Sequence, residues 1–308
     1  MNEWFVKAEN SLNHLTVDDL ANLDESELLL LFHHKSWKHM NESARLLAMQ
    51  EVENRRAQVD GRPPAQVRVA DLDHNQLGEF ESNPDGSSTI FINSRFLKPS
   101  KIFASGDTSI FNAASALSTL LHEGRHAYQD YMLENDLGMV PDQQQLEWAA
   151  VYAPFGGLYC NDDPVIYLLQ SIEMDARRFA RRMIAQVDNF FNATGKADRN
   201  FESQVALDIQ REARLIGAVR ERLDHNKIDQ YEKEVLDYFG RNQPTLDLEN
   251  LRLFDHARFI LDHPEITDPM QMIEALDRMA DEKLCLKDAE HMNRVQAIEA
   301  DSLGQMKG

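Results

Sequence analysis

The sequence of 308 residues has only two cysteines, Cys160 and Cys285. Two thiols so far apart make no disulfide framework, so we expect a reducing compartment, with both thiols buried or idle. No apolar run approaches the length of about 18 residues that a membrane-spanning helix needs. The first residues, Met1 to Phe5, also lack a basic region followed by an apolar one. We therefore expect no membrane span and no ordinary secretory signal, and a cytoplasmic location.

Basic residues are also scarce. The chain has 32 Lys and Arg against 52 Asp and Glu, which gives a formal net charge of -20 at pH 7. A surface this negative repels nucleic-acid phosphates and anionic membranes, so we expect no nucleic-acid partner. Hydrophobic residues make up 43% of the chain, enough for a sizeable core, and the length suits about two domains. The sequence contains no internal repeat and no low-complexity segment.

Two flanking regions are predicted to be helical, residues 1–60 and 191–308. Asp24 with Glu27 resembles a capping box, and Asn41 can cap a helix that continues to about Val59. The second region contains a possible break at 224–226. The histidines of the first region lie beside lysines without a carboxylate at ligand spacing, so no metal is expected there; they are His33, His34 and His39.

The pattern changes in residues 61–190, the predicted catalytic core. Residues 67–72 alternate as a half-buried strand does, 77–81 form a weaker strand, and 89–93 form the best strand of the chain. A turn at 83–86 separates the last two, because Pro84 fixes φ and Gly86 takes a positive φ. The expected fold is therefore α+β and mostly helical, with a small sheet directly before a long helix.

That long helix, for which Asp107, Thr108 or Ser109 is the expected cap, carries the motif His-Glu-x-x-His at His122, Glu123 and His126. Two histidines four residues apart share one helix face and can bind one ion. Zinc accepts neutral imidazole, and a carboxylate beside it can act on water. The pattern also occurs by chance, but a helix context favours zinc. Gly124 is costly inside a helix, so we expect close approach by a strand or a substrate.

Asp163 followed by Pro164 predicts a helix cap and a helix that runs from Pro164 to about Val187. A catalytic zinc site needs a third protein ligand and an open position for water. Glu173 is our choice, because it lies on a helix face lined with small and apolar residues, where an unpaired carboxylate is expensive to bury. A surface pair of Glu173 with Arg177 is the structural alternative. Other acidic residues are rivals, first Glu147 and then Asp162, Asp163 and Asp175.

Three stretches together resemble the zincin metallopeptidase domains of bacterial toxin and phage-type proteins: 122–129 (HEGRHAYQ), 167–176 (YLLQSIEMDA) and 179–180 (FA). The resemblance covers about residues 60–190. It implies a gluzincin arrangement, with His122, His126 and Glu173 on Zn²⁺ and Glu123 as general base. Many gluzincins place an acidic residue four positions after the third ligand, where this chain has an arginine. Asp175 or Asp130 is a substitute for orienting a ligand histidine.

The implied activity is zinc-dependent hydrolysis of a peptide bond in a protein or peptide substrate. Glu123 takes the proton of the attacking water and passes it to the leaving amine. The oxyanion needs a further donor, for which the candidates are Tyr159, Tyr167 and Arg177. The strand at 90–93 is expected to align the substrate backbone.

Two further hypotheses accompany this one. The resemblance, together with the cysteine content, suits an effector or toxin delivered into another cell without a cleavable signal peptide. From another class, the helical regions form a protein-interaction module whose zinc site is structural or inactive. The oligomeric state is not predicted.

Overall fold

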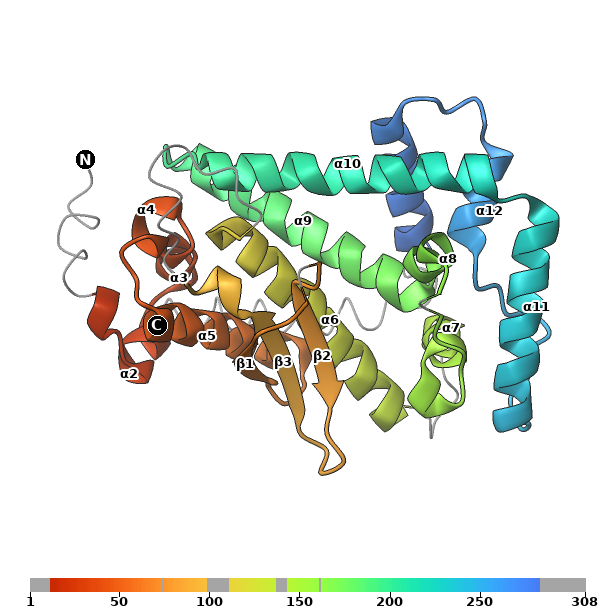
Figure 1. Cartoon of the computed structure of the whole chain (residues 1–308), viewed down its shortest axis with the longest axis horizontal. Helices are drawn as coiled ribbons and strands as arrows, with labels where there is room; N and C mark the ends of the chain where they lie inside the picture. Colours follow the sequence, from red (N-terminus) through yellow and green to blue (C-terminus); the bar gives the residue numbers. More distant parts are fainter. Residues whose placement is uncertain (1–11, 74, 99–110, 137–142, 161, 283–308) are drawn as a thin grey trace, which may run out of the picture. The chain divides into compact units, whose positions relative to one another are not determined.

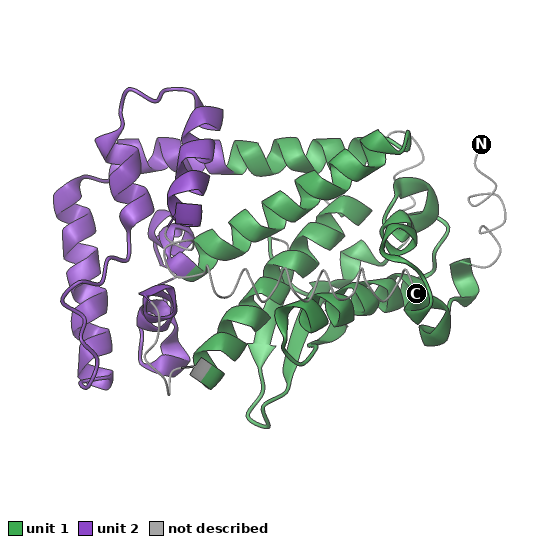
Figure 2. Cartoon of the chain, turned by 180° about the vertical axis from the view of Figure 1, so that it is seen from behind, with its two compact units in different colours: residues 1–135, 172–211 green, residues 136–171, 212–308 purple. Residues whose placement is uncertain are grey.

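A computed structural model describes residues 12–73, 75–98, 111–136, 143–160 and 162–282. These residues fall into two compact units, one drawn from 1–135 and 172–211 and the other from 136–171 and 212–308 (Figure 2). The three expected regions, 1–60, 61–190 and 191–308, divide the chain differently and remain a prediction. Within the described residues the chain is mostly helical with one small sheet, so the coarse α+β expectation is confirmed.

Short helices lead into one long helix at the start of unit 1. Asp24 and Glu27 form the predicted capping box, and the Asn41 side chain accepts a hydrogen bond from the backbone N–H of Ala44. The long helix ends at Gly61, which adopts a φ of 69°. The elements are η1 (Leu12–His14), α2 (Val17–Ala21), α3 (Glu25–Leu31), α4 (His34–Trp37) and α5 (Glu42–Asp60).

The sheet has three strands in the order β1-β3-β2 (Figure 1). They are β1 (Gln66–Ala70), β2 (Gly78–Ser82) and β3 (Ser88–Asn93), and η2 (Ser94–Phe96) follows. β1 pairs with β3 in parallel and β2 pairs with β3 antiparallel. The predicted turn is present, because Gly86 has a φ of 81° and its N–H bonds to the Asn83 carbonyl oxygen. β3 is therefore the central strand, and β2 is an edge.

The motif helix is α6 (Ala113–Asp136). The predicted caps, Asp107, Thr108 and Ser109, lie outside the described residues. Asn112 acts as a cap here: its Oδ1 accepts from Ser115 N at 3.0 Å, and its own N–H donates to Ser115 Oγ at 3.2 Å. This reciprocal pair satisfies backbone groups at the helix start that have no partner within the helix.

The predicted continuous helix from Pro164 to about Val187 is wrong. Asp163 caps α8 (Pro164–Leu169) as expected, but Gln170 has a ψ of 139°, which helical residues do not adopt. α9 (Ser171–Ala193) starts immediately afterwards. Glu173 consequently lies in the first turn of a helix, not in the middle of one, and a carboxylate is favoured there by the positive end of the helix dipole.

The later helices include the predicted break. α10 (Arg199–Arg222) and α11 (His225–Asn242) are separate, and Asp224 caps the second through the N–H of Lys227. The other helical elements of unit 2 are α7 (Gln143–Val151), η3 (Ala153–Phe155), α12 (Asp255–Asp262) and a helix described over 269–282.

The core of unit 1 lies between its helices and the sheet. Ile90 and Ile92 of β3 are fully buried, as are Phe191 of α9 and Phe201 of α10. The same cluster contains the apolar face of α6 just before the motif, including Leu117 and two further leucines, Leu120 and Leu121. The motif helix is thus fixed by packing on one side while its histidines lie elsewhere on its circumference.

In the described residues, no helix combines the length and apolar content needed to cross a bilayer. Cys160 is a free, half-buried thiol.

Candidate metal centre

The two histidines of α6 face each other across one helical turn. The Nε2 atoms of His122 and His126 are 3.2 Å apart, and the ring planes are inclined by 88°. This proximity follows from the spacing of four residues on a regular helix. Both imidazoles therefore present a nitrogen to the same point.

Glu173 completes the group from α9. Its Oε2 lies 3.6 Å from His122 Nε2, and its Oε1 lies 3.5 Å from His126 Nε2. The side chain is only 3% exposed. The structure thus brings the predicted third ligand to both histidines, although Glu173 follows His126 by 47 residues in the sequence.

The donor set fits a zinc ion. Ligand atoms bound at about 2.0–2.1 Å to a tetrahedral ion lie about 3.4 Å from one another. The two imidazole nitrogens are 3.2 Å apart, Glu173 presents Oε1 to His126 at 3.5 Å and Oε2 to His122 at 3.6 Å, and one ligand atom from each of the three residues lies within 4.8 Å of the others. Burial lowers the pKa of His122 to about 3, and the positive charges of Arg177 and Arg211 contribute in the same direction. A neutral imidazole is the form that binds metal.

Glu123 lies beside this group and under the edge strand β2. Its side chain is buried, and the backbone N–H of Phe80 donates a hydrogen bond to its carboxylate. Burial is the main reason that the pKa of Glu123 is raised to about 7; His126 and the Phe80 hydrogen bond lower this pKa, and the carboxylates of Glu173 and Glu79 raise it. A carboxyl group with such a pKa can accept and release a proton near neutral pH.

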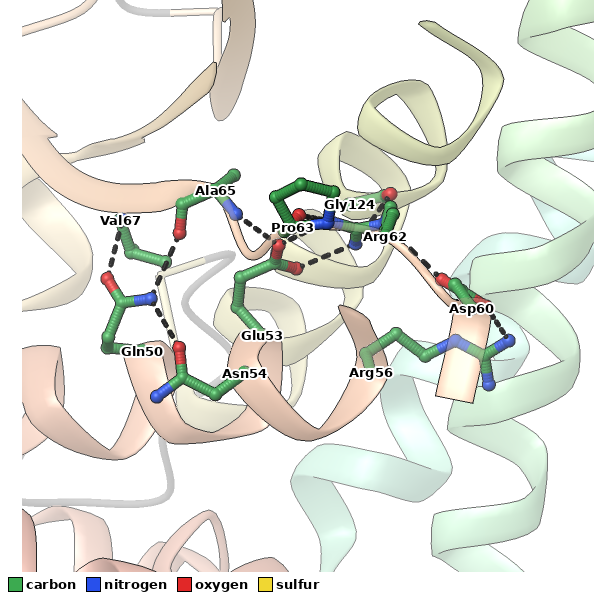
Figure 3. Close-up of polar contacts among 10 residues, drawn as sticks. All are labelled: Gln50, Glu53, Asn54, Arg56, Asp60, Arg62, Pro63, Ala65, Val67 and Gly124. Carbon is green, nitrogen blue, oxygen red and sulfur yellow. Dashed lines mark hydrogen bonds and ion pairs between the residues drawn. The ribbon is translucent and has the colours of Figure 1, made fainter. Parts of the chain in front are cut away.

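The close approach expected at Gly124 is made by the side chains of Glu53 and Arg62 and not by a strand. A Cβ at this position would lie 3.2 Å from Glu53 Oε2, and Arg62 Nη2 donates to the Gly124 carbonyl oxygen at 3.2 Å. Figure 3 shows Arg62 between Glu53 and the motif helix. The glycine therefore makes room for a buried ion pair. The strand that comes close does so at Gly78 of β2, where a Cβ would lie 2.9 Å from Glu123 Cγ.

Asp175, one of the two carboxylates expected to orient a ligand histidine, is linked to His126 through the side-chain amide of Gln129. His126 Nδ1 is bonded to Gln129 Oε1 at 2.8 Å, and Gln129 Nε2 donates to Asp175 Oδ2 at 2.9 Å. Asp175 is also paired with Arg125, with 2.7 Å between Arg125 Nε and Asp175 Oδ2. Sequence reasoning missed Gln129, although its position three residues after His126 was a usable signal.

The candidate oxyanion donors are distributed over both units. Tyr159 and Tyr167 belong to unit 2, where their rings pack edge to face with centroids 5.7 Å apart. Arg177 belongs to unit 1, one turn after Glu173, and its charge acts on His122. Arg177 donates to Met174 Sδ at 2.9 Å.

The rival ligands have other contacts. Glu147 and Asp163 belong to unit 2, and Asp163 caps α8 and pairs with Arg222. Asp162 is exposed and also belongs to unit 2. Asp175 is held by Arg125. In the part of the chain that the structure describes, none of these four joins the group formed by the two motif histidines and Glu173.

The expectation that strand 90–93 aligns a substrate is wrong. β3 is bonded to β1 on one side and to β2 on the other, so its backbone groups are used within the sheet. β2 pairs with β3 alone among the described strands, and on its other edge the Phe80 N–H donates to the Glu123 carboxylate.

A second group, His33, His34 and Asp198, also brings possible ligand atoms together. The sequence prediction considered only carboxylates close to these histidines in the sequence, whereas Asp198 is 164 residues from His34. His33 Nδ1 accepts from Lys35 N, its Nε2 is bonded to the Lys196 carbonyl oxygen, and Asp198 accepts from His34 N. These hydrogen bonds satisfy backbone groups near helix ends, so a structural role of the three residues explains the cluster.

No protein-family model, no curated protein and no solved structure matches this chain. The resemblance to zincins therefore remains a prediction based on the residues quoted above.

Proposed function

We propose that the protein is a zinc-dependent metallopeptidase in which His122, His126 and Glu173 hold the ion and Glu123 is the general base. One observation carries the proposal. His122 and His126 of α6 and Glu173 of α9 each bring a ligand atom within 4.8 Å of the others, with 3.2 Å between the two imidazole nitrogens, and a buried carboxylate follows His122 directly in the motif.

A bound zinc ion would supply Lewis acidity and lower the pKa of a water in the site towards about 7. Glu123 takes a proton from that water and returns it to the nitrogen of the leaving amine. Burial raises the pKa of Glu123, which favours holding the proton between the two transfers. Glu173 would supply a negative charge to the ion, and both imidazoles would bind it in their neutral forms.

The position of β2 supports a peptide substrate. This edge strand reaches Glu123 through the Phe80 N–H, so an extended peptide bound beside β2 would lie next to the general base. Arg177 is the candidate oxyanion donor in the same unit as the ligands, and Tyr159 and Tyr167 remain candidates. Delivery into another cell as an effector or toxin is part of the proposal that rests on the resemblance alone.

The alternative, an interaction protein with a structural zinc site, is less well supported. Structural sites use four protein ligands, whereas catalytic sites keep one position for water. Among the described residues, the group around His122 contains three possible ligands. Three protein ligands, with a fourth position for water, favour a catalytic site over a structural one.

The test compares wild-type protein with Glu123→Gln and His122→Ala. Metal content is measured in each, and new amino termini are mapped after incubation with a proteome. We expect Glu123→Gln to keep zinc and lose cleavage, and His122→Ala to lose both. Cleavage by Glu123→Gln at the wild-type rate would reject the mechanism. Wild-type protein that holds zinc without producing new termini would favour the interaction protein.

A further inference from the structure

The side chain of Gln129 is oriented unambiguously by its three contacts. Its Nε2 donates to the carbonyl oxygen of Ile172 and to Asp175 Oδ2, both at 2.9 Å. A carbonyl oxygen and an ion-paired carboxylate can only accept, so the amide nitrogen must face them. The amide oxygen therefore faces His126 Nδ1, 2.8 Å away.

This orientation fixes the tautomer of His126. An amide oxygen cannot donate, so Nδ1 must carry the hydrogen. The lone pair is then on Nε2, the nitrogen that lies 3.5 Å from Glu173 Oε1. Hydrogen bonding at one ring nitrogen thus presents the other nitrogen to the proposed ion.

The same amide also holds the helix turn that bears Glu173. Ile172, whose carbonyl oxygen accepts from Gln129, directly precedes Glu173 in the first turn of α9. Asp175 is fixed in turn by Arg125, whose Nε and Nη2 donate to its two oxygens at 2.7 and 3.2 Å. Gln129 is 3% exposed, so water does not readily replace these bonds.

We propose that Gln129 is the positioning residue of this centre. It sets the tautomer of His126 and, through the Ile172 carbonyl oxygen, holds the helix turn that bears Glu173. The Asp175–Arg125 pair holds the amide in place. The inference rests on the proposed zinc site for its role, but the tautomer can be measured in protein without metal.

The test uses Gln129→Met, which keeps the length of the side chain and removes its donor and acceptor. Gln50→Met is the matched control, because the Gln50 amide also joins two elements, through the Ala65 carbonyl oxygen and the Val67 N–H, and neither of these residues is a proposed ligand (Figure 3). Zinc affinity is measured by chelator competition. We expect binding about 10- to 100-fold weaker in Gln129→Met and unchanged in Gln50→Met. Equal affinity of Gln129→Met and wild type would overturn the inference.

Nitrogen NMR of the histidine rings in metal-free protein supplies the second measurement. We expect the wild-type His126 to be the Nδ1–H tautomer, and Gln129→Met to gain the Nε2–H form. Gln129→Glu, which keeps an acceptor for Nδ1–H, should retain the wild-type tautomer. An Nε2–H tautomer in the wild type would overturn the inference even if Gln129→Met failed to fold. A wild type with the Nδ1–H tautomer but no zinc binding would reject the proposed function while leaving the assigned orientation intact.

Discussion

Gly78 of β2 lies directly against Glu123 of α6: a Cβ at Gly78 would be 2.9 Å from Glu123 Cγ and 2.6 Å from Thr119 Cγ2. The absence of a side chain lets the edge strand reach the proposed general base. The same approach allows the Phe80 N–H to bond the Glu123 carboxylate. One glycine thus sets the spacing between the edge strand β2 and the motif helix α6.

Gly78→Ala should therefore destabilise the fold and displace β2 from α6. Overpacking of this kind costs about 1–3 kcal/mol. Urea unfolding measures the loss. Gly217→Ala is the control, because no atom lies within 4 Å of its added Cβ, and Ala in place of Gly in a helix stabilises by about 1 kcal/mol. A Gly78→Ala protein as stable as the wild type would show that β2 does not press on α6.

The buried pair of Glu53 and Arg62 gives a second prediction. Both side chains are 1% exposed, and Arg62 also holds the Gly124 carbonyl oxygen (Figure 3). Arg62→Met leaves the Glu53 carboxylate buried without its partner, so we expect a loss of about 3–5 kcal/mol in the free energy of unfolding. The double variant Glu53→Met with Arg62→Met should be less destabilised than Arg62→Met alone. Additive losses in this cycle would contradict the pairing.

Acid should weaken the fold through His33. Burial is the main cause of its lowered pKa, His34 and Lys35 lower it as well, and Asp198 and the Lys196 carbonyl oppose them. The unfolded state therefore binds the proton first, and stability falls as pH drops below the ordinary value of 6.5. The loss is at most about 1.4 kcal/mol per pH unit.

His33→Gln removes this titration. The difference in unfolding free energy between pH 7.5 and 5.5 should be smaller in His33→Gln than in the wild type, although the variant is less stable at both. Asp198 does not interfere in this window. Burial raises its pKa, but the hydrogen bonds from His34 outweigh burial and leave the pKa below 3.8. Equal slopes for the two proteins would show that His33 is not held neutral.

Local features were predictable from the sequence. The caps at Asp24, Asn41 and Asp163 are formed with residues two or three positions away, so their chemistry can be recognised in a short window. The strands and the Gly86 turn follow from alternation and backbone preference in the same way.

Long-range relations were not predictable. The central place of β3 depends on pairing with β1, and the break at Gln170 precedes Ser171, whose Oγ bonds the distant Glu147 carbonyl oxygen. Arg62 meets Gly124 across 62 residues. Propensity and periodicity carry no information about such partners. Glu173 was predicted because an isolated acidic residue on an apolar helix face needs a partner.

Zinc binding by Glu173→Ala tests the central claim most directly. Metal stoichiometry and X-ray absorption are measured on wild type, Glu173→Ala and Glu147→Ala, the last replacing the rival ligand. We expect one zinc per wild-type chain with nitrogen and oxygen ligands at about 2.0–2.1 Å, the same site in Glu147→Ala, and zinc lost or greatly weakened in Glu173→Ala. An unchanged zinc site in Glu173→Ala, or its loss in Glu147→Ala alone, would contradict the account.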